Sequence, residues 1–256
     1  KGVVGLSGID TRALTRIVRE VGVMNAAIVH EEPKDIDKII EKLRASSVRN
    51  AVMSVTCKEK MNYTPEDPAR RVVLWDFGAK ANIRRELVKR GCEVIVMPAN
   101  STAEEIIAER PDGIMLSNGP GDPAENTGII EELKKVCERR IPTFGICLGH
   151  QLLALSQGAK TEKLKYGHRG ANQPAVRTSD KRVFITSQNH GYAVIGDTLP
   201  STASVSYVNG NDGTCEGVDY TDMPAFTVQF HPEASAGPLD TQFLFDRFIG
   251  MIEQKN

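Results

Sequence analysis

The chain has 256 residues, of which 40% are hydrophobic and 25% charged, and this composition is typical of a soluble globular protein with one large or two modest domains. The 32 basic and 33 acidic residues give a net charge of −1, so no overall field attracts nucleic acid or an acidic membrane surface. No apolar run is long enough to span a bilayer, and no signal peptide is recognisable.

The first fifty residues predict a small α+β unit. A helix is expected over Thr11–Glu20 and ends at Gly22, because apolar residues recur there at helical spacing. A strand is expected over Met24–His30 and an amphipathic helix over Pro33–Arg44. The stretch Ser54–Arg70 has little periodicity and contains two prolines, so it is interpreted as a linker.

From Arg71 onward, short apolar strands alternate with helices. The expected strands lie at 72–77, 93–97, 113–117 and 143–146, and the expected helices at 80–90, 102–109, 129–139 and 148–155. After Gln157 the chain is rich in strands, expected at 172–177, 182–186, 203–208, 215–219 and 225–230, before a last helix at 239–252. We therefore expect an α/β fold whose mostly parallel sheet is flanked by helices, with sites at the carboxyl ends of its strands.

Cys147 is the first candidate catalytic residue. It joins an expected strand to an expected helix and stands between Gly145 and Gly149, the pattern of a nucleophile elbow. A helix N-terminus favours thiolate over thiol, because its dipole and its unpaired N–H groups stabilise negative charge. A small buried cysteine in an apolar turn is the alternative, and the local pattern alone does not separate the two.

His231 and Glu233 end an expected strand and supply a candidate base. Residues two apart in an extended segment point the same way, and Pro232 fixes the backbone between them. The carboxylate can then bond one imidazole nitrogen and leave the other free as a general base. An exposed His-Pro turn is the alternative interpretation.

Two further loops carry polar groups or glycines after strands. The stretch 116–123 has two glycines and two prolines, and its backbone N–H groups suit an oxyanion hole, although a plain connection is the alternative. The stretch 186–193 could line a polar ligand pocket, or form a turn with a satisfied histidine. The stretch 166–172 receives no chemical role, and His150 is expected to be structural.

Taken together, these stretches resemble the class I, or triad, glutamine amidotransferases over roughly residues 71–253. The residues that carry the resemblance are Phe144–Gln151 for the nucleophile motif, Phe230–Glu233 for the His-x-Glu motif and Leu116–Gly121 for the oxyanion strand. Three more stretches narrow the resemblance to the small, glutamine-hydrolysing chain of carbamoyl-phosphate synthetase: Ser7–Leu14, Trp75–Gly78 and Gln188–Tyr192.

This resemblance implies hydrolysis of L-glutamine to glutamate and ammonia through a γ-glutamyl thioester. It implies Cys147 as nucleophile, His231 as base and Glu233 as the group that orients His231, with an oxyanion hole at Gly119 and Leu148. The residues that it implies for glutamine binding are Gly119, Gly121, Leu148, Gln151, Asn189, Gly191 and Tyr192.

The resemblance also implies a partner. Ammonia would be channelled to a large synthetase subunit that uses ATP and Mg to make carbamoyl phosphate for arginine and pyrimidine synthesis. No metal or other cofactor is expected in this chain, and no nucleic-acid or membrane partner. The five cysteines form neither a disulfide framework nor a Cys-x-x-Cys metal pair, so a cytoplasmic location is expected.

Other functions stay open at this point. The chain could serve another class I amidotransferase, such as those of anthranilate or GMP synthesis, or be a non-catalytic interaction subunit. The motif at 7–12 precedes the domain and favours the carbamoyl-phosphate family over the other amidotransferases. Intact Cys147, His231 and Glu233 argue against a subunit that has lost its activity.

The family resemblance divides the chain into three parts. Residues 1–53 are expected to be the C-terminal part of the small chain's N-terminal domain, 54–70 a linker, and 71–256 the amidotransferase domain. The start at Lys1 indicates a piece of a longer chain, and the family's glutamine-holding serine is expected in the missing part. Arg169 and Gln173 replace two histidines of the family's histidine-rich loop, which weakens a metal or proton role there.

Overall fold

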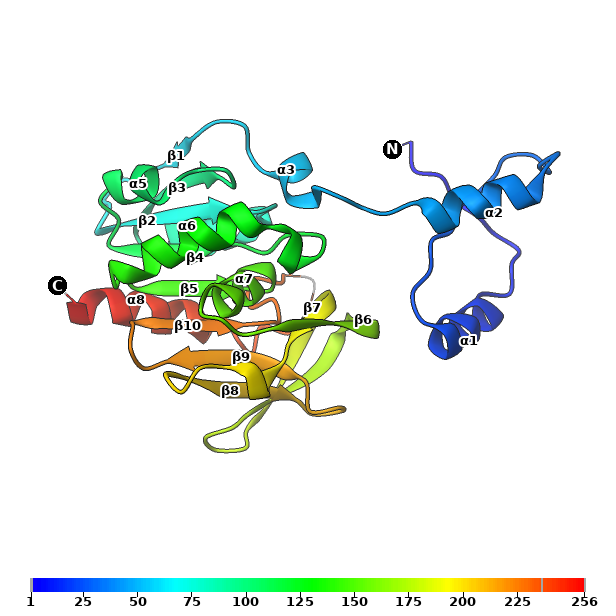
Figure 1. The fold of residues 1–256 in the computed structure, drawn as a ribbon. Coiled ribbons are helices and arrows are strands. Elements are labelled where there is room, and N and C mark those ends of the chain that lie inside the picture. The colour runs from blue at the N-terminus through cyan, green and yellow to red at the C-terminus, as the bar shows by residue number, and fades with distance from the viewer. Residues whose placement is uncertain (1, 236, 256) are drawn as a thin grey trace.

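The computed structural model describes residues 2–235 and 237–255, and within them one mixed sheet of ten strands forms the centre of the molecule (Figure 1). The strands are β1 (Met61–Tyr63), β2 (Arg70–Asp76), β3 (Cys92–Pro98), β4 (Gly113–Leu116), β5 (Thr143–Ile146), β6 (Thr161–Arg177), β7 (Val183–Val194), β8 (Ala203–Asn209), β9 (Cys215–Tyr220) and β10 (Ala225–Val228). The helices are α1 (Thr11–Val21), α2 (Ile36–Ala45), α3 (Ala51–Val55), α4 (Ala81–Lys89), α5 (Ala103–Ala108), α6 (Thr127–Glu138), α7 (Leu148–Ser156) and α8 (Phe243–Lys255), with short 3-10 turns η1 (Pro123–Glu125) and η2 (Gly196–Thr198).

The sheet confirms the expected α/β class and refines it. Its order is β1-β3-β2-β4-β5-β10-β9-β8-β6-β7. The five strands from β3 to β10 pair in parallel, whereas β1 at one edge and the strands from β9 to β7 at the other pair antiparallel. Four of the five parallel strands, β2 to β5, lie in the part where strand–helix alternation predicts parallel pairing, because parallel neighbours need a crossover connection; β10 comes from the strand-rich part.

Two apolar layers hold the helices on the sheet. Alternate residues of β2 point to opposite faces, so Val73 and Trp75 join one layer while Val72 and Leu74 join the other. The first layer includes apolar residues of α5, α6 and α7, and the second includes those of α4 and α8. Helices thus cover both faces of the parallel strands, as buried parallel sheets require.

The strand expected over Met24–His30 is wrong. These residues are irregular in the structure, because within the described chain they have no neighbouring strand with which to form a ladder. Both expected helices nearby are present as α1 and α2, each capped by an aspartate, Asp10 and Asp35. The expected linker holds β1, which pairs with β3.

The polar strands β6 and β7 are longer than the sequence predicts. Each was expected to cover only the apolar end of the observed strand, at 172–177 and 182–186. The two strands form a ribbon with register shifts between Lys163 and His168 and between Gly170 and Gln173. Bulges of this kind interrupt the alternation of apolar and polar residues, so the pattern hides the strand.

Residues 2–50, which we call the arm, stand apart from the sheet in Figure 1. No side chain of α1 or α2 is buried. One backbone hydrogen bond connects the arm to β6, from Val23 N to the Lys165 carbonyl at 3.1 Å. Among the described residues, no helix combines the length and apolar character needed to cross a membrane.

Candidate functional site

Cys147 occupies the sharp turn between β5 and α7. Its φ of 54° and ψ of −102° lie outside the ordinary regions for an L-residue, and its N–H donates to the Val228 carbonyl of β10 at 2.8 Å. The side chain is 4% exposed. Strained non-glycine backbone of this kind is concentrated at functional sites, and here the strain aims the thiol at the carboxyl edge of the sheet.

The two flanking glycines are required by close approach. A Cβ at Gly149 would lie 2.5 Å from the Leu116 carbonyl oxygen, and one at Gly145 would lie 2.8 Å from the Thr227 methyl carbon. The expected nucleophile elbow therefore has a physical cause: α7 packs its first turn directly onto the backbone of β4.

His231 and Glu233 follow β10 and form a buried pair. Their Nδ1 and Oε1 atoms lie 2.7 Å apart, which is the length of a charge-assisted hydrogen bond. The His231 N–H donates to the Ser187 carbonyl at 2.9 Å, which fixes the segment against β7. The Lys80 ammonium lies 3.4 Å from Glu233 Oε1 and places a positive charge beside the carboxylate.

The electrostatics of this pair include Cys147. Burial alone lowers the pKa of His231, but the electrostatic interaction and the hydrogen bond with Cys147, together with Glu233, outweigh it and raise that pKa to about 9. Burial raises the pKa of Glu233, and His231 and Lys80 reverse the effect, so that this pKa is lowered overall. The geometry thus brings the three expected catalytic residues together.

The glycine loop after β4 lies against the start of α7. A Cβ at Gly119 would lie 2.6 Å from a Leu148 side-chain carbon, so the loop backbone approaches the elbow closely. The Gly149 N–H donates to the Ser117 carbonyl at 3.0 Å and ties the two segments. Gly119 and Leu148 are therefore neighbours beside Cys147, as an oxyanion hole built from their N–H groups would require.

A cleft of about 620 Å³ opens beside Cys147. Most of the residues expected to bind glutamine line it: Gly119, Gly121, Gln151, Asn189, Gly191 and Tyr192. Leu148 is buried beneath the cleft rather than in its lining, so its side chain serves the core. The amide nitrogen of Gln151 already makes two hydrogen bonds: Nε2 donates to the Tyr192 carbonyl at 2.7 Å and to Gln229 Oε1 at 2.8 Å.

The arm also borders this cleft, which sequence reasoning missed. The lining contributed by the arm is Val23, Asn25, Ser46, Ser47 and Val48. The Asn25 amide donates to the Leu43 and Ser46 carbonyls at 2.8 Å each, and so joins the two sides of the arm near the cleft. No local pattern signals this contact, since about a hundred residues separate Ser47 from Cys147.

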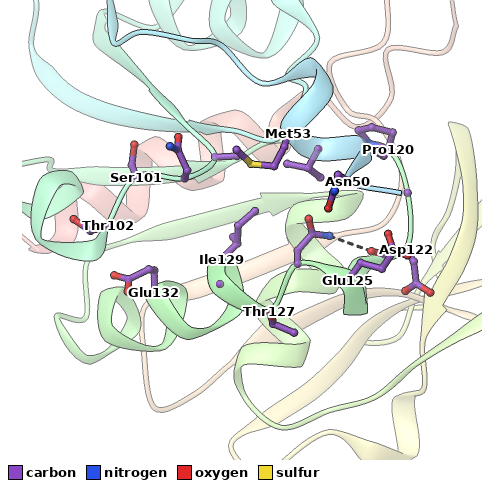
Figure 2. A pocket seen from close by; sticks show the side chains of 17 residues that line it. Asn50, Met53, Ser101, Thr102, Pro120, Asp122, Glu125, Thr127, Ile129 and Glu132 are labelled. Atoms are coloured by element: carbon purple, nitrogen blue, oxygen red, sulfur yellow. Dashed lines mark hydrogen bonds between the residues drawn. The ribbon is translucent and has the colours of Figure 1, made fainter. Parts of the chain in front are cut away.

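A second cavity of about 380 Å³ lies on the other side of the glycine loop (Figure 2). Its walls come from α3, the segment after β3, and the start of α6, with Met53, Thr102 and Ile129 among its lining. Pro120, Gly121, Asp122 and Glu125 line both cavities, so the loop separates them.

His150 has the contacts of a core residue, as expected. It is fully buried, and its Nδ1 pairs with Thr227 Oγ1 at 2.8 Å. Burial lowers its pKa to about 3, so the imidazole stays neutral.

Comparison with known proteins identifies relatives of this chain. A family model described as glutamine amidotransferase class-I matches residues 73–251. The carbamoyl phosphate synthase small chain of Bacillus anthracis is 50% identical over 254 residues, which cover 99% of this chain and 68% of that protein. The small chain of Syntrophotalea carbinolica is 46% identical over 268 residues, covering 98% of this chain and 71% of that one.

Solved structures share the fold. A Thermoplasma acidophilum protein described as part of a GMP synthase superposes with a TM-score of 0.64 at 22% identity, covering 73% of this chain and 95% of that one. A glutamine amidotransferase from Thermotoga maritima gives a TM-score of 0.53 at 18% identity, covering 73% of this chain and 85% of that one. At these identities the likeness concerns the fold alone.

Proposed function

Because this chain belongs to the carbamoyl phosphate synthase small chains of the class-I glutamine amidotransferase family, we propose that it hydrolyses L-glutamine to glutamate and ammonia through a Cys147–His231–Glu233 triad. The observation that carries the proposal is the strained Cys147 elbow beside a buried His231–Glu233 pair. A nucleophile, a base and an orienting carboxylate are the groups that covalent amide hydrolysis needs.

In the first half-reaction, the Cys147 thiolate attacks the side-chain amide carbon of glutamine. The carbonyl oxygen becomes an oxyanion, which the backbone N–H groups of Gly119 and Leu148 stabilise. The His231 imidazolium, whose pKa is raised by Cys147 and Glu233, then gives its proton to the departing nitrogen. The carbon–nitrogen bond breaks, ammonia leaves, and a γ-glutamyl thioester remains on Cys147.

In the second half-reaction, neutral His231 accepts a proton from water. The resulting hydroxide attacks the thioester carbon, and the same N–H groups hold the second oxyanion. Collapse of this intermediate releases glutamate and returns the Cys147 thiolate, with the proton on His231. Glu233 keeps the Nδ1 side of the ring occupied, so that the other nitrogen faces the reacting atoms.

Glutamine would lie in the 620 Å³ cleft with its amino-acid head toward the glycine loop and β7. Gly121, Gln151, Asn189, Gly191 and Tyr192 are the proposed contacts for that head. The arm closes the cleft from the other side, and the hydroxyl of Ser47 is a candidate for the role that the family gives to a serine farther toward the N-terminus.

The proposal extends to a partner. Ammonia would pass to a large synthetase subunit that uses ATP and Mg to make carbamoyl phosphate for arginine and pyrimidine synthesis, in the cytoplasm. The hydrolysis itself calls on no metal or cofactor in this chain. Relatives about 50% identical are carbamoyl phosphate synthase small chains, and this favours that partner over an anthranilate or GMP synthase.

The test is Cys147→Ser. The substitution exchanges sulfur for oxygen at a buried turn, so the fold should be retained while glutamine-dependent ammonia release falls by at least about 10³-fold, as for loss of a nucleophile elsewhere. Ammonia is measured by a coupled glutamate dehydrogenase assay in the presence of the large partner chain, and unchanged circular dichroism is the control. Ammonia release at the wild-type rate would overturn the mechanism.

A further inference from the structure

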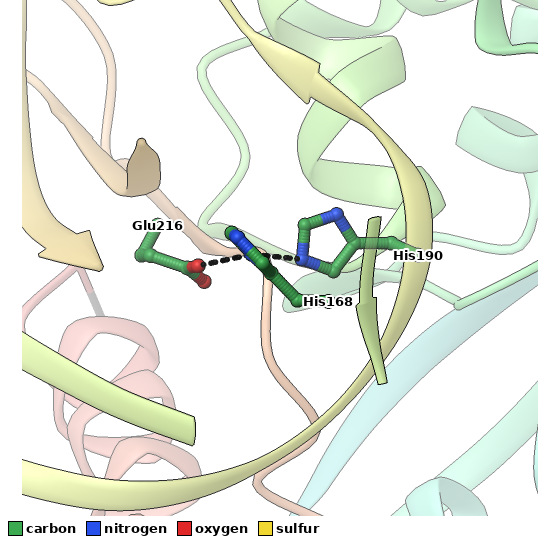
Figure 3. A group of neighbouring side chains, drawn as sticks. All are labelled: His168, His190 and Glu216. Carbon is green, nitrogen blue, oxygen red and sulfur yellow. Dashed lines mark hydrogen bonds and ion pairs between the residues drawn. The ribbon is translucent and has the colours of Figure 1, made fainter. Parts of the chain in front are cut away.

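Three buried side chains meet between the strands of the antiparallel part of the sheet. His168 of β6, His190 of β7 and Glu216 of β9 place one donor atom each within 4.8 Å of one another (Figure 3). We call these residues the histidine cluster. None of them belongs to the proposed triad. β6 and β7 follow each other along the chain, and β8 lies between β6 and β9 in the sheet.

In each imidazole, the ring nitrogen that points away from the other histidine (the outer nitrogen) already has a hydrogen-bond partner. His168 Nε2 lies 2.9 Å from Asp212 Oδ2, and His190 Nδ1 lies 2.8 Å from the Tyr192 carbonyl oxygen. A carboxylate and a carbonyl only accept hydrogen bonds, so each of these outer nitrogens carries the proton. When the rings are neutral, the two nitrogens that face each other, His168 Nδ1 and His190 Nε2, carry no proton. Each then offers a lone pair, and the two atoms lie 3.2 Å apart.

Further acceptors point at the same place. Glu216 Oε1 lies 3.2 Å from His168 Nδ1, and the Gln188 side-chain oxygen lies 3.1 Å from His190 Nε2. Glu216 is 0% exposed, and its second oxygen, Oε2, is buried without a hydrogen-bond partner. The Asn209 amide is a donor nearby, at 3.0 Å from Glu216 Oε1 and 3.4 Å from His168 Nδ1. One neutral amide does not balance a buried carboxylate, so the arrangement calls for a cation, either a protonated His168, which lies between Glu216 and Asp212, or a metal ion.

We propose that the histidine cluster is a binding site for a divalent transition metal, with Zn²⁺ as the best match, held by His168 Nδ1, His190 Nε2 and a Glu216 carboxylate oxygen. Two imidazoles and a carboxylate are a set that zinc uses in proteins. The Gln188 oxygen or a water supplies a fourth position. A dication balances Glu216 and Asp212.

Two of the three distances between the proposed ligand atoms favour a metal over a shared proton, and the third, from His190 to Glu216, is within 4.8 Å. With bonds of about 2.0–2.1 Å, tetrahedral ligand atoms lie about 3.3 Å apart. Both contacts of His168 Nδ1, to His190 and to Glu216, measure 3.2 Å. A proton on that nitrogen would draw the carboxylate to about 2.7–2.9 Å, as His231 and Glu233 do at 2.7 Å.

The outer contacts are those that a metal site needs. Metal-bound imidazoles usually donate their other N–H to a carboxylate or a backbone carbonyl, which fixes the tautomer and the ring. Asp212 and the Tyr192 carbonyl fill these places. The metal would tie β6, β7 and β9 beneath Asn189, Gly191 and Tyr192, and so brace one wall of the cleft. Its role is structural and does not depend on the proposed hydrolysis.

The experiment uses the full chain carrying Cys147→Ser, which removes the catalytic thiol as a competing ligand. After treatment with a chelator, the protein is titrated with Co²⁺, whose visible absorption reports tetrahedral coordination, and Zn²⁺ is then added to displace it. We expect one Co²⁺ per chain and full displacement by one Zn²⁺. His30→Gln in the same background removes an exposed histidine of the arm and should bind Co²⁺ unchanged.

Two variants test the ligands. Glu216→Gln keeps the shape of the side chain and removes its charge, so the affinity for Co²⁺ should fall more than 100-fold. Asp212→Asn leaves the three proposed ligands in place and weakens the contact that orients His168, so it should cost about 10–100-fold in Co²⁺ affinity; Asn can keep the acceptor for Thr214. The proposal is overturned by a wild-type cluster that binds no stoichiometric Co²⁺, or by binding that survives Glu216→Gln in a folded protein. A doubly protonated His168 seen by NMR in metal-treated protein would also overturn it and assign the cluster to a shared proton.

Discussion

The His231–Glu233 pair of the triad is buried away from water and is stabilised by electrostatic attraction. Glu233 is 1% exposed and His231 is 4% exposed, so each ion alone would pay a large desolvation cost. Their 2.7 Å contact and the Lys80 ammonium offset that cost, which is why the pKa of Glu233 falls despite burial. Removing only one partner of such a buried ion pair is strongly destabilising, because it leaves the other charge buried and unpaired.

Glu233→Gln therefore tests the orienting role. The amide keeps the shape but not the charge, so the His231 ring loses its preferred tautomer, and kcat for ammonia release should fall about 10²–10⁴-fold. Because Glu233 raises the pKa of His231, that pKa should also fall from its value of about 9. NMR titration of the His231 ring measures the shift, and a pKa equal to that of the wild type would contradict this role.

The same pair has a pH-dependent effect on stability. Folding raises the pKa of His231 from about 6.5 to about 9, so its stabilising contribution is complete below the first value and is lost as pH rises through the second. The wild-type advantage in unfolding free energy over Glu233→Gln should thus be largest near pH 6 and shrink toward pH 10. Urea unfolding across this range measures it, and an advantage that grows with pH would reverse the assigned sign.

At the scale of elements, the site is made by the ends of three adjacent parallel strands. β4, β5 and β10 lie side by side in the sheet, so the loops that follow them meet at one edge. Strand–helix alternation predicts this convergence for β4 and β5 without knowledge of the order, whereas β10 lies in the strand-rich part of the chain, outside that alternation. The local spacing identifies Cys147 and the His231–Glu233 pair. The histidine cluster could not be predicted in this way, because Glu216 is related to His168 by antiparallel pairing through β8 and not by spacing.

Gly149→Ala tests the packing of α7 on β4. A methyl group there would lie 2.5 Å from the Leu116 carbonyl oxygen, and backbone cannot move aside cheaply, so we expect a loss of about 1–3 kcal/mol of stability and a displaced elbow. Gly128→Ala is a matched control, because Gly128 is also the second residue of a helix but has open space. It should be neutral or stabilise by up to about 1 kcal/mol. Equal effects of the two changes on thermal unfolding would contradict the close approach.

At the scale of the whole molecule, the two walls of the cleft differ in how well their side chains are buried. The sheet supplies one wall from a packed core, whereas the arm supplies the other with no buried side chain in α1 or α2. The sequence predicts both helices but not their place, because an amphipathic pattern states which face is apolar and not what that face covers. The strand expected at 24–30 failed for the same reason, since a strand depends on a neighbour that local sequence does not reveal.

Gly22→Ala tests whether the arm closes the cleft. Gly22 has a φ of +100°, and a methyl group there would lie 2.8 Å from the Lys165 carbonyl oxygen, next to the hydrogen bond from Val23. The change should release the arm, speed amide exchange at Val23, and raise KM for glutamine several-fold while the melting temperature of the sheet stays unchanged. Gly8→Ala is the control, because Gly8 also has a positive φ, of +78°, but has open space around it, so the change strains the backbone of the arm without touching β6. If both variants raise KM equally, strain within the arm and not its contact with β6 shapes the cleft.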